Sequence, residues 1–577
     1  MKNEILVLLN EEIEQKQETK NIYHPELINK FLKKNQYLNF LNSFSENTNK
    51  RDESFENFTN LQEELFDEFY SNLNFFFNKN LSKDIWRVLV GSWFHFALET
   101  FYNRYFSIKN YIKSDNVSLC YIDIPNTIEQ FASKNTEDFI TNIDNKNWNS
   151  FIYKTIFDEL GTPYQVYKKN NKIEPSTNKK TNKIMLDKIF YYYNKFALRF
   201  NKSLIVDTYL PNFNNILLQL KLRKIPIFSF PDNFKYKYLK KYSIQDRNKF
   251  LSNFIKNKNE IDIKIFKKLL TFSIPLSLFE NFEYFVNEIK KNKTLSNLKF
   301  ILSSQNYDSN EYFKYIAFIN KINKNKLLYI QHGNNTGTSK FDGYDNSLIT
   351  ATNFFTWGYS HQENQIPLFN IKISGCKKIT KKLEIGDQMI FYSLYRPIKR
   401  YFWDSMSMYN ESFNNQLNFI KNLSNSIQSK TFFKFHPTLD DNKIFYLSQN
   451  LNEINSNIKK ISGKIKIKKF KIAIYSYDST GFYEYLSLNK PVIGLWKNSI
   501  TEVNEKSKKY YLALKEAGLI HENYIQLAEF LNSNWENLGD WWFSKKVQDA
   551  INFFTSEYSL YERKPVKEFI SKIKKII

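Results

Sequence analysis

The amino-acid sequence predicts an α/β protein in which two Rossmann-like domains face a cleft and the N-terminal half is enriched in helices. At 577 residues, the chain is too long for one compact core, because single domains usually hold about 100 to 200 residues. Short apolar runs alternate with helical patterns, as in parallel α/β layers. Eleven of the 13 glycines lie at or after Gly333, so the two halves are built differently.

The first series of elements predicts an N-terminal, acceptor-side domain with helical additions over residues 1–375. A long helix is expected over 84–105, where aromatic residues recur at helical spacing. Five apolar or β-branched runs, each followed by polar or turn residues, are predicted to be strands. They cover residues 5–9, 203–206, 225–230, 299–303 and 327–330.

A second series predicts a Rossmann-like domain over residues 376–543. Its strands are expected at 388–393, 430–435, 471–475 and 491–495, with a helix at 482–488. The stretch 338–382 shows little pattern and is predicted to cross between the domains. Residues 544–577 are predicted to form a helix that packs back on the N-terminal domain.

The chain is strongly basic, with Lys+Arg 83 against Asp+Glu 59 and a formal net charge of +24. One explanation is a negatively charged partner, such as a phosphorylated substrate, an anionic membrane surface or nucleic acid. The other is a coding bias, since the sequence is rich in Lys, Asn, Ile, Phe and Tyr and has only 13 Gly and 13 Pro. Hydrophobic residues make up 42%, which is enough for a core and excludes disorder by composition.

The small number of cysteines excludes two classes of site. Cys120 and Cys376 are the two cysteines, too few for a disulfide framework or a four-cysteine metal site.

The first ten residues do not resemble a signal peptide, and the longest apolar stretch, 88–98, is about half as long as a membrane-spanning helix needs to be. We therefore expect a cytoplasmic protein, at most peripheral at the inner membrane face.

The strongest motif covers residues 479–494, STGFYEYLSLNKPVIG. A buried strand ends before it, Ser479, Thr480 and Gly481 form the turn, and a helix follows. A helix N-terminus presents free N–H groups and a positive dipole end, which suit a phosphate. Glu484, one turn into the helix, can accept hydrogen bonds from ribose hydroxyls. The alternative is a simple capping box.

Two histidines follow predicted strands. His436, in FKFHPT, lies where ligands bind in open α/β sheets, and we expect it to donate to a phosphate oxygen. His332 would face the second domain across the cleft, as a general base or as a group that stabilises a leaving phosphate. Its neighbours Gln331, Gly333 and Asn334 are further cleft candidates. Either histidine could instead be a structural turn residue.

Three other charged residues are weighed as site candidates. Arg396 offers a planar fork for a diphosphate, or is a solvated loop residue. Asp207 ends a predicted strand and could activate an acceptor as a base, although Asp is common at strand ends. Arg87, in the helix expected over 84–105, is an acceptor-side candidate or part of a buried helix.

Several familiar motifs are missing from the sequence. It has no Walker loop, no G-x-G-x-x-G, no nucleophile elbow, no H-E-x-x-H and no compact D-x-D. These absences favour a metal-independent reaction with no cofactor beyond a nucleotide-activated substrate.

The motifs resemble those of GT-B sugar transferases. The spacing from Glu484 to Pro491 is similar to their E-A-x-x-x-G-x-P signature, with Tyr485 in place of the small residue and Asn489 in place of glycine. The HPT segment with the Ser479–Thr480 pair resembles bacterial sialyltransferases and Kdo transferases, which use CMP-sugars. CDP-glycerol polymerising transferases share a similar layout.

A closer resemblance is to a family of transferases from surface-polysaccharide (O-antigen) gene clusters. It rests on WRVLVGSW, QHG, TNFFTWGYS, HPT and STGFYE, in scattered blocks over about residues 80 to 500. That family usually has Gly-Pro-Trp where this chain has Gly91-Ser92-Trp93, and glycine at Asn334. The resemblance implies a bacterial cytoplasmic enzyme that builds a cell-surface glycan, such as lipopolysaccharide, from a nucleotide-sugar.

Three functions stay open at this point. The first is a glycosyltransferase that moves a sugar from a CMP-sugar, such as Kdo or a nonulosonic acid, to a glycan or lipid-linked acceptor. The second is a CDP-polyol phosphotransferase on the same scaffold. The third is a non-catalytic, basic nucleic-acid-binding protein, but the sequence holds no recognised nucleic-acid module, and we expect no such partner.

Overall fold

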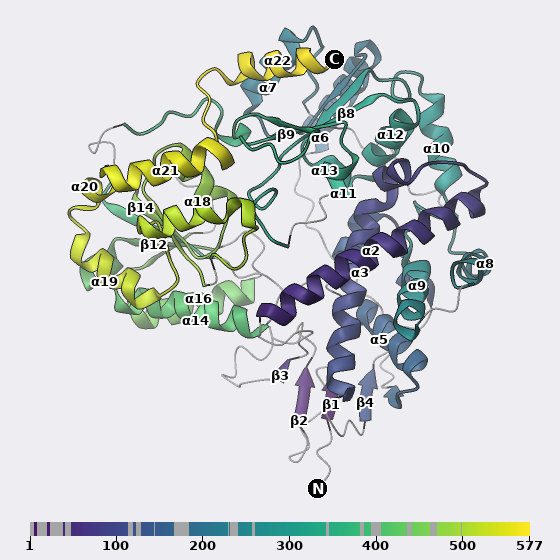
Figure 1. The fold of residues 1–577 in the computed structure, drawn as a ribbon, viewed down its shortest axis with the longest axis horizontal. Helices are drawn as coiled ribbons and strands as arrows, with labels where there is room; N and C mark the ends of the chain where they lie inside the picture. Colours follow the sequence, from purple (N-terminus) through teal and green to yellow (C-terminus); the bar gives the residue numbers. More distant parts are fainter. Residues whose placement is uncertain are drawn as a thin grey trace.

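Three parallel sheets and a large body of helices make up the computed structural model (Figure 1). The structure describes the following residues: 5–8, 20–23, 39–40, 48–113, 119–122, 128–143, 145–166, 184–228, 230, 240–256, 260–341, 346–380, 386–393, 406–435, 441–461, 470–497 and 499–577.

All strand pairs between named strands in these segments are parallel, which confirms the predicted α/β class. The N-terminal sheet has the order β3-β2-β1-β4-β5, the middle sheet β10-β9-β8-β7-β6, and the C-terminal sheet β13-β12-β11-β14-β15-β16. The strands are β1 Ile5–Leu8, β2 Lys20–Tyr23, β3 Asn39–Phe40, β4 Leu119–Ile122, β5 Tyr164–Val166, β6 Leu204–Ile205, β7 Phe300–Ser303, β8 Lys326–Ile330, β9 Asn353–Thr356, β10 Gln365–Pro367, β11 Gln388–Tyr392, β12 Thr431–Lys434, β13 Lys459–Ile461, β14 Phe470–Tyr475, β15 Val492–Leu495 and β16 Ile520–His521. The separate N-terminal sheet was not predicted.

The strand predicted at 225–230 is wrong for the described residues 225–228, which form an irregular segment. Two of its backbone amides donate hydrogen bonds to side chains instead of to a neighbouring strand. The amide of Ile225 donates to Asn201 Oδ1 at 3.0 Å, and that of Ile227 donates to Gln219 Oε1 at 2.8 Å. Local side-chain bonds of this kind compete with sheet pairing.

The stretch 338–382 has more regular structure than predicted. Its residues form β9 and β10, and β9 pairs with β8 in parallel. Phe354 and Phe355 are buried, so this short apolar run completes the middle sheet.

The helices surround these sheets, and the long helix predicted at 84–105 lies inside α3. They are α2 Thr48–Phe77, α3 Lys83–Lys113, α4 Thr136–Asn142, α5 Lys146–Leu160, α6 Ile184–Phe200, α7 Asn212–Lys221, α8 Ile244–Phe254, α9 Ile261–Ser273, α10 Phe282–Lys291, α11 Asn306–Ser309, α12 Glu311–Ile322, α13 Asn346–Thr350, α14 Met406–Asn422, α15 Asn425–Ser429, α16 Asp441–Ile454, α17 Thr480–Ser487, α18 Glu505–Glu516, α19 Tyr524–Asn534, α20 Leu538–Trp542, α21 Lys545–Tyr558 and α22 Pro565–Ile576, with 3-10 turns at Ile128–Phe131 and Ile371–Ile373.

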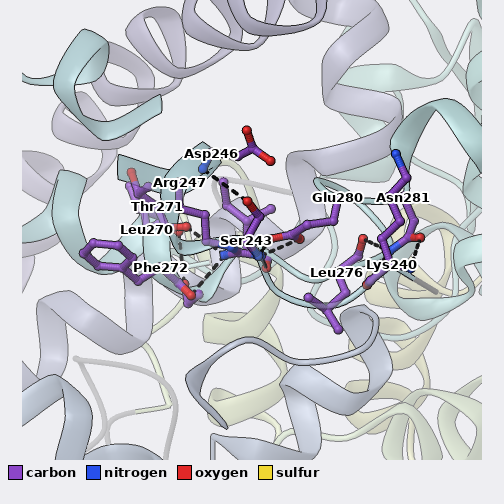
Figure 2. Close-up of polar contacts among 12 residues, drawn as sticks. Lys240, Ser243, Asp246, Arg247, Leu270, Thr271, Phe272, Leu276, Glu280 and Asn281 are labelled. Atoms are coloured by element: carbon purple, nitrogen blue, oxygen red, sulfur yellow. Dashed lines mark hydrogen bonds and ion pairs between the residues drawn. The ribbon is translucent and has the colours of Figure 1, made fainter. Parts of the chain in front are cut away.

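A buried arginine fixes the meeting point of α8 and α9 (Figure 2). The Arg247 guanidinium donates to Glu280 and to the carbonyls of Thr271, Phe272 and Ile274 at 2.7 to 3.0 Å. These carbonyls belong to the end of α9, where a helix lacks internal donors. Arg247 therefore caps α9 while its charge is paired with Glu280.

The C-terminal segment predicted as one helix is two helices. α21 packs with α17 and α18 beside the C-terminal sheet. α21 ends at Tyr558, and the second helix, α22, begins at Pro565. α22 lies beside α7 on the middle sheet, at the top of Figure 1. Proline suits the first helical turn because its missing N–H is not needed there.

Among the described residues, no helix combines the length and apolarity that crossing a bilayer requires.

Candidate functional site

A cavity of about 330 Å³ lies where the loop after β8 meets the carboxyl ends of β11, β12 and β14. Ligands of open α/β sheets bind at such ends. The lining residues are Asn334, Asn335, Tyr392, Ser393, Lys434, Phe435, Tyr475, Tyr477, Asp478, Ser479, Thr480 and Gly481. The fold thus brings Asn334, from the middle sheet, to the predicted Ser479–Thr480–Gly481 turn.

The first turn of α17 forms one wall of this cavity. Ser479 is the N-cap, and its hydroxyl accepts from the Phe482 amide at 3.3 Å. The capping interpretation is therefore correct for the Ser479 hydroxyl. A Cβ at position 481 would collide with the Tyr475 hydroxyl, so a larger residue there would force the Tyr475 ring to move.

Thr480 connects the two sides of the cleft. Its hydroxyl donates to Asn334 Oδ1 at 3.2 Å and accepts from the Asn334 amide at 3.3 Å. Gly333 lies close by, since a Cβ there would be 3.3 Å from Thr480 Oγ1. The loop after β8 is held against the start of α17 by these contacts.

Gln331 is buried and shapes that loop. Its Oε1 accepts from the Trp357 amide at 2.7 Å, and its Nε2 donates to the Gly333 carbonyl at 2.8 Å. Because both ends of its side-chain amide are hydrogen-bonded within the protein, Gln331 positions the turn that carries His332.

His332 stands at the cleft end of β8 with an exposed side chain. Its ring stacks on Tyr209, with 4.7 Å between ring centroids, and Lys372 Nζ lies 4.6 Å from the centroid of the same tyrosine. Desolvation by the surrounding protein and the Lys372 charge lower the pKa of His332 to about 4. The imidazole is therefore neutral at neutral pH, and it is a weaker base than a solvated histidine.

Lys372 and Glu484 are half-buried charges that lie close enough to influence each other's pKa. Burial lowers the pKa of Lys372, which the Glu484 charge opposes. Burial raises the pKa of Glu484, which Lys372 and Lys490 oppose. Within the described part of the chain, neither side chain forms a hydrogen bond or an ion pair.

A tyrosine pair lines another part of the cavity. Tyr392 and Tyr475 stack with their ring centroids 4.3 Å apart and nearly parallel. Lys434 Nζ is 5.7 Å from the Tyr392 centroid, and burial lowers the pKa of this lysine. Tyr392 and Lys434 were not predicted as site residues, although each lies one residue before the end of a predicted strand, 388–393 or 430–435.

Asp478, just before the helix cap, was also missed. Its Oδ2 accepts from the Tyr511 hydroxyl at 2.6 Å, and Tyr511 contacts the hydroxyl of Tyr483, which donates to Thr338 Oγ1 at 3.1 Å. Burial raises the pKa of Asp478 to about 6, opposed by Tyr511 and Asn334. No spacing in the sequence relates these residues.

Asp207 and Arg87 are not among the residues that line the cavity. Asp207, after β6, accepts from Asn306 Nδ2 at 2.6 Å and has a positive φ of 45°. Arg87 is buried in the helical body, where it pairs with Glu63 and its guanidinium carbon lies 4.9 Å from the Phe66 ring centroid. His436 and Arg396 lie outside the described residues.

The family described as LIC12162 family transferase matches residues 23–573, which include every residue lining the cavity. The chain belongs to the LIC12162 transferase family. The prediction of a transferase is thus confirmed at the level of this family, which does not specify a donor or an acceptor. No curated protein matches the chain.

The chain is also distantly similar to solved structures. MnaA from S. aureus, in a co-structure with UDP, is 12% identical with a TM-score of 0.35, over 65% of this chain and 96% of that one. The UDP-GlcNAc 2-epimerase of Methanocaldococcus jannaschii, with UDP-GlcNAc and UDP, is 14% identical with a TM-score of 0.33, over 65% and 99%. WaaG, a glycosyltransferase involved in lipopolysaccharide biosynthesis, is 11% identical with a TM-score of 0.28, over 64% and 99%.

Proposed function

We propose that this transferase is a metal-independent glycosyltransferase that moves a sugar from a nucleotide-activated donor to a cell-surface glycan acceptor. The donor we favour is a CMP-sugar, such as Kdo or a nonulosonic acid. The observation that carries the proposal is the first turn of α17, which lines a cavity at the carboxyl ends of three parallel strands beside Lys434. A helix N-terminus and an ammonium group together suit a nucleotide phosphate.

The donor fits this arrangement in two parts. Its phosphate would lie near Thr480, Gly481 and Lys434, with His436 as a further donor. Its ribose hydroxyls would donate to Glu484, whose carboxylate has no hydrogen-bond partner among the described residues. The transferred sugar would then extend toward the side of the cleft that holds His332 and Lys372.

The reaction needs a base and a stabilised leaving group. His332, whose imidazole is neutral at neutral pH, accepts the proton of the acceptor hydroxyl as the new bond forms, with Asp207 as the alternative base. The acceptor oxygen bonds to the anomeric carbon as that carbon's bond to the phosphate oxygen breaks. The electron pair leaves with the nucleotide, and the positive groups around the phosphate stabilise its charge.

The acceptor side of the proposal includes a membrane. A lipid-linked glycan would place the enzyme at the cytoplasmic face of the inner membrane, as a peripheral protein. The net charge of +24 suits an anionic leaflet.

The test is a thermal-shift titration with CMP, CDP, UDP and GDP, with EDTA present throughout. A ligand that binds only the native state, at about 100 times its Kd, adds about 2.7 kcal/mol of stability. We expect CMP to raise the Tm most, and Ser479→Ala and His436→Ala to weaken that rise. A titration in which no nucleotide shifts the Tm would remove the proposal.

Ser243→Ala is the matched control for Ser479→Ala. Ser243 caps α8 in the same way, and its hydroxyl accepts from the Asp246 amide at 3.2 Å. Each change should cost about 1 kcal/mol of stability through the lost cap. Only Ser479→Ala should also weaken nucleotide binding, and an equal effect of both would mean that α17 is merely capped.

A further inference from the structure

Helix α6 and the segment after α7 expose a group of phenylalanines. Phe196 is 55% exposed and Phe200 61%, with their ring centroids 4.9 Å apart. Phe228 is 45% exposed and Phe190 42%, with ring centroids 5.7 Å apart. Two pairs of large aromatic side chains, on α6 and between α6 and the segment after α7, are thus exposed to solvent.

Other positions of α6 pack into the core. Ala197 and Leu198 are buried in the main hydrophobic cluster, and Tyr193 packs on that cluster and on Phe228. β6, which follows α6, is the edge strand of the middle sheet. Phe196 and Phe200, which are more than half exposed, therefore contribute little to the packing of this sheet.

Positive charge accompanies these aromatics. Residues 190–228 contain six basic residues and one acidic residue, Asp207, which accepts a hydrogen bond from Asn306. The basic residues are Lys195, Arg199, Lys202, Lys221, Arg223 and Lys224. Lys299 joins them in space: the pKa of Lys224 is lowered by burial and by the charges of Lys299 and Lys202.

We propose that this surface, the α6 face, docks on an anionic membrane. The α6 face consists of Phe190, Phe196, Phe200 and Phe228 with Lys195, Arg199, Lys202, Lys224 and Lys299. Aromatic rings enter the region between headgroups and acyl chains, while lysine and arginine stay at the anionic headgroups. The face deepens the membrane part of the proposed function, but it requires no nucleotide, so either proposal can fail alone.

The test measures binding to sedimented vesicles of phosphatidylcholine with 30% phosphatidylglycerol, and to vesicles of phosphatidylcholine alone, at 50 and 500 mM NaCl. We expect tight binding only to the anionic vesicles at low salt. Each lysine near the surface contributes about 1 kcal/mol, so Lys195→Glu/Lys202→Glu/Lys299→Glu should weaken binding about 100-fold or more.

The aromatic part is tested separately with Phe196→Ser/Phe200→Ser. This pair should weaken vesicle binding about tenfold or more, because two side chains no longer enter the interface. The control for the aromatic pair is Phe75→Ser/Phe553→Ser, on α2 and α21, where the side chains are 66% and 43% exposed. The control for charge is Lys249→Glu/Lys290→Glu/Lys546→Glu, three exposed lysines on other helices.

Three results would overturn the proposal. The wild-type protein could fail to bind anionic vesicles at 50 mM NaCl. The α6-face variants and their controls could weaken binding equally, which would mean a diffuse charge effect. The α6-face variants could leave vesicle binding intact while they abolish self-association in sedimentation, or binding to a single-stranded oligonucleotide, which would assign the face to a second copy or to nucleic acid. Circular dichroism and the midpoint of thermal unfolding without nucleotide verify that every variant is folded.

Discussion

At the scale of single residues, the candidate site joins groups that lie far apart in the sequence. His332 and Glu484 could be predicted, because one follows an apolar run and the other belongs to a helix-start motif. Tyr209 and Lys372 could not, because no pattern marks them. Only the fold brings the Tyr209 ring to 4.7 Å from that of His332 and to 4.6 Å from Lys372 Nζ.

Asp478 gives a prediction about pH. Its pKa is raised from 3.8 to about 6 by burial, so the folded protein holds this proton more tightly than the unfolded chain. The resulting stabilisation is complete below about pH 3.8 and is lost as the pH rises through 6. We expect the unfolding free energy of the wild type, relative to Asp478→Asn, to fall by about 1 to 3 kcal/mol between pH 4 and 7.

Urea unfolding at constant ionic strength measures this difference. Tyr511→Phe is a useful companion, because the Tyr511 hydroxyl donates to the carboxylate and opposes the rise in pKa. Without that bond, the loss of stability should move to higher pH. A wild-type minus Asp478→Asn difference that is constant from pH 4 to 7 would contradict the assignment.

At the scale of elements, apolar runs predicted most described strands of the middle and C-terminal sheets to within one or two residues. The run at 471–475 became β14, and that at 299–303 became β7. The run at 225–230 failed because Asn201 and Gln219 supply hydrogen bonds to its backbone. An apolar pattern predicts that a segment is buried, and its backbone amides then need hydrogen-bond acceptors. A partner strand is necessary only where side chains do not supply these acceptors.

The end of α9 gives a prediction about stability. Arg247 is fully buried and donates to three carbonyls and to Glu280. Arg247→Met should destabilise the protein by about 3 to 5 kcal/mol, because a buried carboxylate and three carbonyls lose their donor. Lys545→Met, which breaks an exposed pair with Asp549, should cost less than about 0.5 kcal/mol in the same urea experiment. Equal losses would show that the buried arginine is not the cap of α9.

At the scale of the whole molecule, the sequence predicted parallel sheets facing a cleft, and the cavity lies between segments of two of them. The N-terminal sheet was missed because its strands β2 and β3 are short and partly polar. The two helices of the C-terminal segment were read as one, since both have apolar positions at helical spacing. The sheet that each helix covers is decided by tertiary packing, and it cannot be predicted from the local periodicity of apolar residues.

The packing of α22 on the middle sheet can be tested through Phe569. This ring is fully buried, and its centroid lies 5.1 Å from that of Phe355 in β9. Phe569→Ala should cost about 3 to 5 kcal/mol through lost burial and the cavity that remains. Phe553→Ala, on α21, removes a ring that is 43% exposed and should cost about 1 kcal/mol or less.

Hydrogen exchange then locates the loss. If α22 belongs energetically to the middle sheet, Phe569→Ala should reduce amide protection in β6 to β9 more than in β11 to β15, because local opening follows cooperative units. Equal reductions in both sheets would instead mean that the bridge between Thr480 and Asn334 and the packing around it make the two sheets unfold together. The cleft would then be held in one geometry, and a substrate would have to enter it without a separation of its two sides.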